Sequence, residues 1–443
     1  MRFRDIFTFD FLLKIDYLLL LSVLILLVLG VLFIYSSGIT SDGIQVSVEY
    51  IRQIIWASSG LAVAIVLAMI NYRKFYNISL YIYLISLLPL LYSIIFGRTI
   101  YSTTTRWFRI GSFGIQMSEF VKISVIILLA RYLADTDRNR KTFSRFFVSC
   151  LIVFIPMGIV LLQPDLGTAL VYIAIFIAMV FLAGVSMRYV VFMMSCIALT
   201  GVFLVLPLWQ TYILRKSMPF LAVITNPRII IITVLFLLII ASIAFFGYIK
   251  FKKKYFFWIV YASIIIVLSL GTSYAARLIL KNYQIMRLIV FLDPNVDPRG
   301  AGWNIIQSVT AIGAGGLIGR GYLQGTQSHY SFLPEQSTDF IFSIYSEETG
   351  FLGGLVVFSL FMIIFLRLLM TMKTTTDPFA KYICAGFMGM LSFHFIVNVG
   401  MTMGIMPITG IPLLFMSYGG SSVLAAMICI GLVLSIYIRR YNR

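Results

Sequence analysis

Several carboxylates stand beside Arg, Lys or Gln in a chain that is otherwise strongly apolar, and these are the residues best suited to chemistry. Asp297 opens the stretch DPRGAG, which runs to Gly302. A carboxylate can serve as a general base toward a hydroxyl or help to hold a divalent cation. An Asp before a Pro is also a common turn residue. Local sequence therefore leaves both a catalytic and a purely structural role open for Asp297.

A second group surrounds the start of an apolar stretch near residue 118. Glu119 and Lys122 are three positions apart and would share one helix face. Ionisable groups in such a setting are costly unless they face a cavity or a partner. Arg106 and Arg109 precede them, and guanidinium groups suit phosphates. The alternative is a structural ion pair at a helix start with Ser118 as the cap.

Further polar residues occur in short motifs along the chain. Asp165 lies in the stretch QPDLGT, where it is either a site residue or the cap of the next helix. Glu347 and Glu348 are adjacent inside an apolar stretch and need a wet or protein-lined environment. The remaining polar candidates are Gln307, Gln327, Glu335 and Asp339.

Other kinds of site are not indicated. The two histidines, His329 and His394, are too isolated for a His-based metal site, and the four cysteines form no CxxC pair. The glycine-rich stretch 313–321 does not have the spacing of a dinucleotide-binding loop, so we expect its glycines to permit tight turns or close approach to a ligand. No P-loop is present, so ATP hydrolysis is not indicated.

The elements that must position these residues are membrane helices. The chain of 443 residues is 61% hydrophobic and 11% charged, whereas soluble domains have about 25% charged residues. This composition excludes an ordinary soluble enzyme, a disordered protein and a nucleic-acid binder. Backbone groups in lipid must be satisfied within each segment, which predicts an all-α polytopic membrane protein. About twelve stretches are long enough to span a bilayer: 16–36, 53–71, 77–96, 118–134, 146–163, 167–184, 189–207, 229–249, 255–275, 339–367, 381–403 and 418–438.

The net charge of +18 is best explained by topology. With a cytoplasmic N-terminus, about 21 of the Lys and Arg residues fall on the inside, as the positive-inside rule requires. An even number of spans then places the C-terminus in the cytoplasm too. We expect one integral membrane domain over 1–443, an ordered extracytoplasmic loop over 276–338 that includes short helices, and a broken helix or a plain loop around 407–422.

Taken in order, the motifs resemble those of the SEDS family (shape, elongation, division and sporulation), over nearly the whole chain. The residues that carry the resemblance are Trp107, Gln116-x-Ser118-Glu119-x-x-Lys122, Gln163–Thr168, Asp297-Pro298-x-Gly300-x-Gly302, Ala311–Gly316, Phe332–Glu335, Thr338–Phe342, Pro407–Leu413 and Ser417–Ser421. The stretches 325–327 and 332–335 are more similar to the elongation branch than to the division branch.

The resemblance implies a peptidoglycan glycosyltransferase that polymerises lipid II, the undecaprenyl-diphosphate-linked disaccharide-pentapeptide, in cell elongation and cell-shape maintenance. It implies the bacterial cytoplasmic membrane, an active site on the extracytoplasmic side and Asp297 as the catalytic residue. Implied partners are a class B penicillin-binding protein and other elongation-complex membrane proteins, with no nucleic acid. Family members typically have ten spans, so 208–275 is expected to hold an inserted helix pair, and Met117 stands where the family usually has Pro.

A mechanism follows in which Asp297 accepts the proton of the acceptor 4-hydroxyl and undecaprenyl diphosphate leaves. The candidate substrate-binding residues are Arg106, Arg109, Glu119, Lys122, Asp165, Gln307, Gln327, Glu335 and Asp339. No tightly bound cofactor is expected; a divalent cation, Mg²⁺ or Mn²⁺, stays open, and no metal ligands are assigned. The alternatives are a lipid II flippase, a division-branch polymerase and a scaffold that only recruits the transpeptidase.

Overall fold

The computed structural model describes residues 14–96, 107–110, 113–136, 142–214, 216, 218–280, 282–330 and 332–440. It divides into two compact units. The first comprises Met1–Val185 with Gln307–Arg443, and the second is Ser186–Ile306. Helix α13 (Ala301–Gly315) begins in the second unit and ends in the first.

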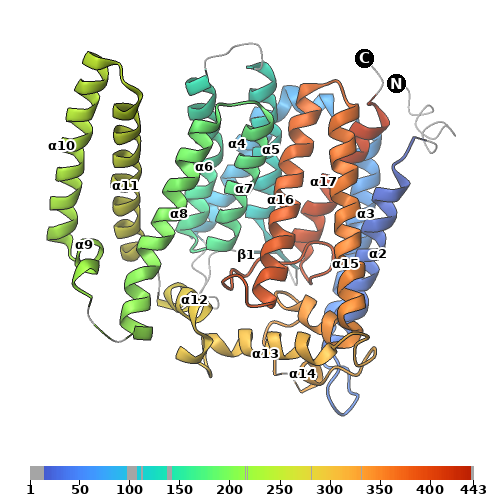
Figure 1. The fold of residues 1–443 in the computed structure, drawn as a ribbon. Helices are drawn as coiled ribbons and strands as arrows, with labels where there is room; N and C mark the ends of the chain where they lie inside the picture. Colours follow the sequence, from blue (N-terminus) through green and yellow to red (C-terminus); the bar gives the residue numbers. More distant parts are fainter. Residues whose placement is uncertain are drawn as a thin grey trace. The chain divides into compact units, whose positions relative to one another are not determined.

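Long helices dominate the first unit (Figure 1). Its elements are α2 (Tyr17–Ser37), α3 (Glu49–Met69), α4 (Arg73–Phe96), β1 (Trp107–Ile110), β2 (Phe113–Gln116), α5 (Met117–Asp135), α6 (Thr142–Leu162), α7 (Leu166–Leu182), α14 (Thr326–His329), α15 (Ile341–Thr374), α16 (Pro378–Thr402) and α17 (Gly420–Ile438). The second unit holds α8 (Met187–Trp209), the π-helix η2 (Gln210–Leu214), the short η3 (Pro219–Leu221), α9 (Ala222–Thr225), α10 (Pro227–Phe251), α11 (Lys254–Ile279), α12 (Asn282–Leu292) and the 3-10 helix η4 (Pro294–Val296).

The predicted all-helical membrane fold is confirmed, and each of the twelve predicted ranges overlaps an α-helix. Among the described residues, ten helices are long and apolar enough to cross a membrane. Helix α7 falls short in length, and α5 carries Glu119 and Lys122 in its first turns. The chain is therefore a multi-pass membrane protein, while twelve spans and cytoplasmic termini stay predictions. The segment expected to be an ordered loop holds α12, α13 and α14.

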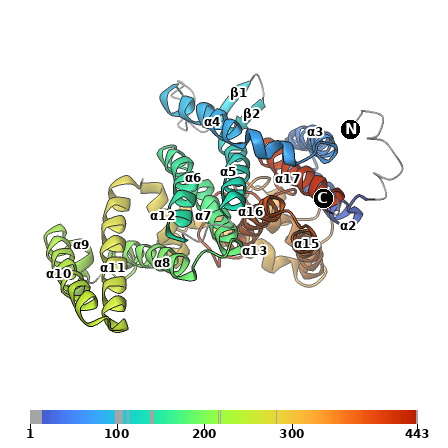
Figure 2. The ribbon, with the colours of Figure 1, turned by 90° about the horizontal axis from the view of Figure 1, so that it is seen from above.

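Helices α16 and α17 form the centre of the first unit. In each, 78% of the most apolar window is buried, against 44% or less in α2, α3, α4, α6 and α15. Helix α16 packs against α5, α7 and α15, and α17 packs against α3; Figure 2 shows α16 between α7 and α15. Polar side chains on α16 therefore face protein rather than lipid, which lowers the cost of burying them.

Prolines within two helices leave carbonyls without a helical donor, since Pro has no N–H. Pro156 in α6 frees the carbonyl of Ile152, and the Tyr83 hydroxyl from α4 donates to it at 3.0 Å. In the second unit, Pro207 in α8 frees the carbonyl of Phe203, which accepts from the Arg277 guanidinium of α11. Each freed carbonyl thus accepts a hydrogen bond from a neighbouring helix, as an apolar environment requires.

Candidate active site

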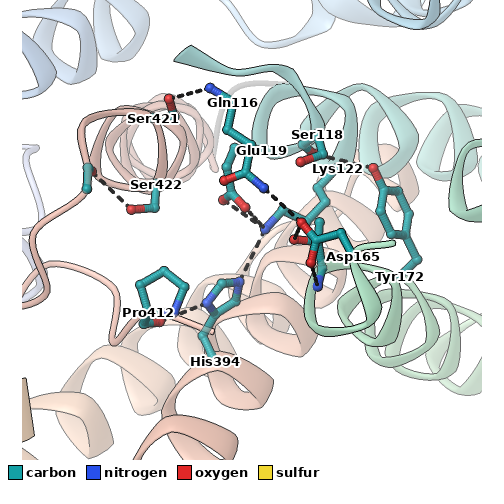
Figure 3. Close-up of polar contacts among 12 residues, drawn as sticks. Gln116, Ser118, Glu119, Lys122, Asp165, Tyr172, His394, Pro412, Ser421 and Ser422 are labelled. Atoms are coloured by element: carbon teal, nitrogen blue, oxygen red, sulfur yellow. Dashed lines mark hydrogen bonds and ion pairs between the residues drawn. The ribbon is translucent and has the colours of Figure 1, made fainter. Parts of the chain in front are cut away.

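Glu119, Lys122 and His394 form a buried polar cluster between α5 and α16 (Figure 3). The Lys122 ammonium donates to both Glu119 carboxylate oxygens at 2.8 Å and lies 3.2 Å from Nε2 of His394. Lys122 is fully buried, and Glu119 is 4% exposed. The three N–H groups of Lys122 are thereby matched by three acceptor atoms.

The neighbours of His394 define its tautomer. Its Nδ1 lies 3.0 Å from the carbonyl oxygen of Pro412, which can only accept. We therefore assign the proton to Nδ1, which leaves Nε2 to accept from Lys122. His394 thus connects the ion pair of α5 to the chain that follows α16. The contact between His394 and Lys122 was not predicted from the sequence, since the two residues are 272 positions apart.

A second set of polar contacts lies beside this cluster, at the start of α7. Asp165 caps α7 by accepting from the Thr168 amide at 3.2 Å and the Thr168 hydroxyl at 3.0 Å. Its Oδ2 also accepts from the Gln116 side chain at 3.0 Å. Tyr172, one turn beyond Thr168 on α7, donates its hydroxyl to the carbonyl of Ser118 at 3.3 Å. The capping role considered for Asp165 is present, and the same carboxylate also ties α7 to the start of α5.

An unpredicted β-hairpin precedes α5. Strands β1 and β2 pair antiparallel, with Trp107 opposite Gln116, and β2 leads directly into the helix. The amide of Gln116 donates to the Ser421 hydroxyl of α17 at 2.8 Å. The hairpin therefore fixes where α5 begins. Arg109 lies in β1, but its side chain is outside the described part of the structure, as is all of Arg106.

The segment 403–419 between α16 and α17 is irregular, and most of its residues from 411 to 417 are buried. Asn398, one turn beyond His394 on α16, donates to the carbonyls of Ile411 at 2.8 Å and Asp339 at 2.9 Å. A Cβ at Gly167 would lie 2.4 Å from the Thr409 oxygen, so glycine permits α7 to approach this segment. Of the two forms expected around 407–422, a broken helix or a plain loop, the structure shows a loop up to Gly419. Side chains of the neighbouring helices hold this loop in place.

Asp297 lies in the second unit, at the turn between η4 and α13. Its carbonyl accepts from the amides of Gly300 at 3.3 Å and Gly302 at 2.9 Å. A Cβ at Gly300 would lie 2.3 Å from an Asp297 carboxylate oxygen, and one at Gly302 would lie 2.2 Å from the Pro294 carbonyl oxygen. The two glycines of the DPRGAG stretch thus leave room for the carboxylate and for the turn. The Asp297 side chain is partly exposed.

The other predicted site residues lie in three places. Gln307 is in α13. Gln327 is in α14, where its backbone N–H donates to the Glu347 carboxylate. Glu335 is exposed in the stretch before α15, with a φ of 52°. Asp339 contributes its carbonyl to Asn398. The structure therefore brings Glu119, Lys122 and Asp165 together with His394, and places Asp297 in the other unit.

No three His, Cys, Asp or Glu side chains among the described residues gather in a way that could hold a metal ion.

Comparison with known proteins identifies relatives along the whole chain. The family model described as "Cell cycle protein", which covers FtsW, RodA and SpoVE, matches residues 17–229 and 217–442. The peptidoglycan glycosyltransferase RodA of Treponema pallidum is 47% identical over 442 residues, covering 99% of this chain and 100% of that protein. The peptidoglycan glycosyltransferase MrdB of Escherichia coli is 31% identical over 389 residues, covering 88% of this chain and 85% of that protein.

Solved structures agree in fold. A chain from a peptidoglycan synthase complex, studied for its coordination of polymerization and crosslinking, has a TM-score of 0.67 at 25% identity, over 97% of this chain and 99% of that one. The rod shape determining protein RodA of Thermus thermophilus has a TM-score of 0.59 at 22% identity, over 97% of this chain and 98% of that one. Both family-model matches together span nearly the entire sequence, and the chain belongs to the FtsW, RodA and SpoVE family of cell cycle proteins.

Proposed function

We propose that this chain is a peptidoglycan glycosyltransferase that polymerises lipid II during cell elongation and cell-shape maintenance. The observation that carries the proposal is the full-length similarity to a RodA named for this activity. The Asp297 turn supports it, because its glycines leave space around a partly exposed carboxylate. A partly exposed acid held in a defined turn is suited to accept a proton from a bound hydroxyl.

The reaction joins two lipid-linked disaccharides. The 4-hydroxyl oxygen of the acceptor sugar bonds to the anomeric carbon of the donor, and the bond from that carbon to the diphosphate oxygen breaks. Asp297 takes the hydroxyl proton, and undecaprenyl diphosphate leaves with the bonding electrons. Attack opposite the leaving group inverts the anomeric carbon, and a single base suffices because the acceptor itself is the nucleophile.

The leaving diphosphate needs positive charge nearby. We propose that Arg106 and Arg109 contact it and that Lys122, which is fully buried against Glu119 and His394, adds to the positive potential without touching it. Substrate-binding roles for Glu119, Asp165, Gln307, Gln327, Glu335 and Asp339 remain part of the proposal. We propose no tightly bound cofactor; Mg²⁺ or Mn²⁺, where used, would arrive with the diphosphate.

The proposed setting is the bacterial cytoplasmic membrane, with chemistry on its extracytoplasmic side. A class B penicillin-binding protein would supply crosslinking, and other membrane proteins of the elongation complex would join it. Support for a crosslinking partner comes from the similar chain in a complex described as coordinating polymerization and crosslinking.

The glycines of the Asp297 turn provide one test. We expect Gly302→Ala to lower kcat by about 10²-fold, because a new Cβ would displace the Pro294 carbonyl and the turn, and small misplacements of a catalytic group are that costly. Steady-state polymerisation measures the effect. Gly313→Ala is the matched control in α13, since nothing lies within 4 Å of its added Cβ. Equal activities of the two variants would contradict the assigned role of the turn.

A flippase is the competing function, favoured by buried charge and by the break in α15 at Gly350. Purified protein in vesicles with labelled lipid II distinguishes the cases. Glycan polymer supports a polymerase. Movement of lipid II between leaflets without polymer supports a flippase, and neither activity with retained partner binding supports a scaffold.

A further inference from the structure

Helix α15 is interrupted near its start by chain from the preceding loop. Gly350 has a φ of 68° and a ψ of −163°, which breaks the helical ladder. The amides of Phe351 and Leu352 instead donate to the carbonyls of Gly316 and Leu317, at 2.9 and 3.1 Å. On the other side of the break, the carbonyls of Glu347 and Glu348 accept from the backbone amides of residues 320 and 321, respectively, each at 3.0 Å. The stretch 316–321 thus replaces the hydrogen bonds that the break removes.

Two glycines, Gly315 and Gly319, lie in close contact with the backbone of α15. A Cβ at Gly315 would lie 2.1 Å from the Ser346 oxygen, and one at Gly319 would lie 2.1 Å from the Glu348 oxygen. Gly319 also has a φ of 81°, a conformation that glycine adopts at little cost. The sequence predicted tight turns or close approach to a ligand; the structure shows close approach to a helix backbone instead, with Gly319 in a left-handed conformation.

Glu347 extends this contact through its side chain. The carboxylate is fully buried and accepts from the Thr326 amide at 2.7 Å, the Thr326 hydroxyl at 3.0 Å and the Gln327 amide at 3.1 Å. These donors open the short helix α14. Hydrogen bonds to an ionised acceptor are about twice as strong as neutral ones, so Glu347 holds the start of α14 against α15.

Glu348 makes a second attachment beside the first. It is 2% exposed, and it accepts from the Leu323 amide at 3.0 Å and from the Ser36 hydroxyl of α2. Among the described residues, neither carboxylate forms an ion pair with Lys or Arg. Their burial is therefore offset by hydrogen bonds from the loop, and the loop in turn depends on them.

The contacts that Glu347 and Glu348 make with the chain 316–327 follow the C-terminal end of α13. The Asp297 turn directly precedes the N-terminal end of the same helix. Helix α13 begins at Ala301, directly after the turn, and ends at Gly315 against Ser346. We propose that Glu347 and Glu348 are positioning residues: they anchor the chain from 316 to 327 to α15, which fixes the C-terminal end of α13, the helix that directly follows the Asp297 turn. The inference rests on the proposed function, because the positioned group is its general base.

The test combines kinetics with amide hydrogen exchange on the full-length protein. We expect Glu347→Gln to raise exchange of the 323–327 amides about tenfold, because an amide oxygen accepts more weakly than a carboxylate oxygen and the NH2 group of Gln would replace the Oε2 that accepts from the Gln327 backbone N–H at 3.3 Å. Exchange in α5 and α16 should stay at the wild-type level. We expect kcat for lipid II polymerisation to fall by about 10- to 100-fold, with KM within about twofold. Glu49→Gln, a carboxylate in the first turn of α3, is the matched control and should leave both readouts unchanged.

Unchanged exchange at 323–327, or faster exchange there with an unchanged kcat, overturns the proposal. If Glu347→Gln raises exchange throughout the protein, Gly319→Ala replaces it. That variant disturbs the same contact from the loop side. Faster exchange confined to 323–327 together with a lower kcat supports the proposal, and wild-type values of both quantities overturn it. A wild-type protein that makes no polymer refutes the proposed function and this positioning role, while the exchange measurement still shows whether the two glutamates anchor the loop.

Discussion

Replacing Asp297 with Asn is expected to lower kcat for lipid II polymerisation by about 10²–10⁴-fold, the usual contribution of a positioned general base. Asn has nearly the same shape and cannot take up the hydroxyl proton. The turn should survive, because the hydrogen bonds from the Gly300 and Gly302 amides go to the backbone carbonyl of residue 297. KM should change little. The rate of undecaprenyl diphosphate release at saturating lipid II measures the effect.

Asp293 provides the matched control for this variant. It lies in the same segment, and its carboxylate caps η4 by accepting from the Asn295 amide at 2.9 Å. Asp293→Asn removes the same formal charge from the same region. We expect its rate to stay within about tenfold of wild type, since a weakened cap costs about 1 kcal/mol of local stability. Equal losses in the two variants would indicate a general effect of charge in place of a base at Asp297.

The second large effect concerns stability. Lys122→Met is expected to destabilise the protein by about 3–5 kcal/mol, because it leaves the Glu119 carboxylate buried without its cation. The side chains of Lys122 and Glu119 are only 0% and 6% exposed, so water cannot replace the lost partner. Thermal unfolding of the purified protein in detergent, followed at a fixed heating rate, measures the loss.

Two further variants separate pairing from other effects. Glu119→Gln combined with Lys122→Met should be more stable than Lys122→Met alone, because no unpaired charge remains. Arg131→Met is the control on the same helix. Its pair with Asp135 is 3.7 Å apart and 33% and 44% exposed, so its loss should cost at most about 1 kcal/mol. A Lys122→Met protein as stable as Arg131→Met would contradict the importance of the buried pair.

The sequence predicts the helices well because the bilayer constrains them so strongly. A spanning segment needs about 20 apolar residues and must satisfy its own backbone, so composition alone locates it. All twelve ranges contain helices for this reason. The Glu119–Lys122 pair could be predicted from the sequence as well, since residues three apart on a helix are neighbours. The structure adds that this pair is internal.

Contacts between distant segments could not be predicted in the same way. His394 reaches Lys122 across 272 residues, and Ser36 reaches Glu348 across 312. Such pairings depend on how the helices pack, which hydrophobic periodicity does not specify. The function of the glycine-rich stretch was ambiguous for a related reason. Glycine allows close approach to any group, and only the fold shows that the group is the backbone of α15.

The most direct test of the central claim is the yield of glycan polymer from purified wild-type protein and Asp297→Asn, each supplied with lipid II and the partner transpeptidase, with and without Mg²⁺ or Mn²⁺. We expect polymer from the wild type and none above background from Asp297→Asn under any of these conditions. Polymer from Asp297→Asn in wild-type amounts would show that Asp297 is not the base of the reaction.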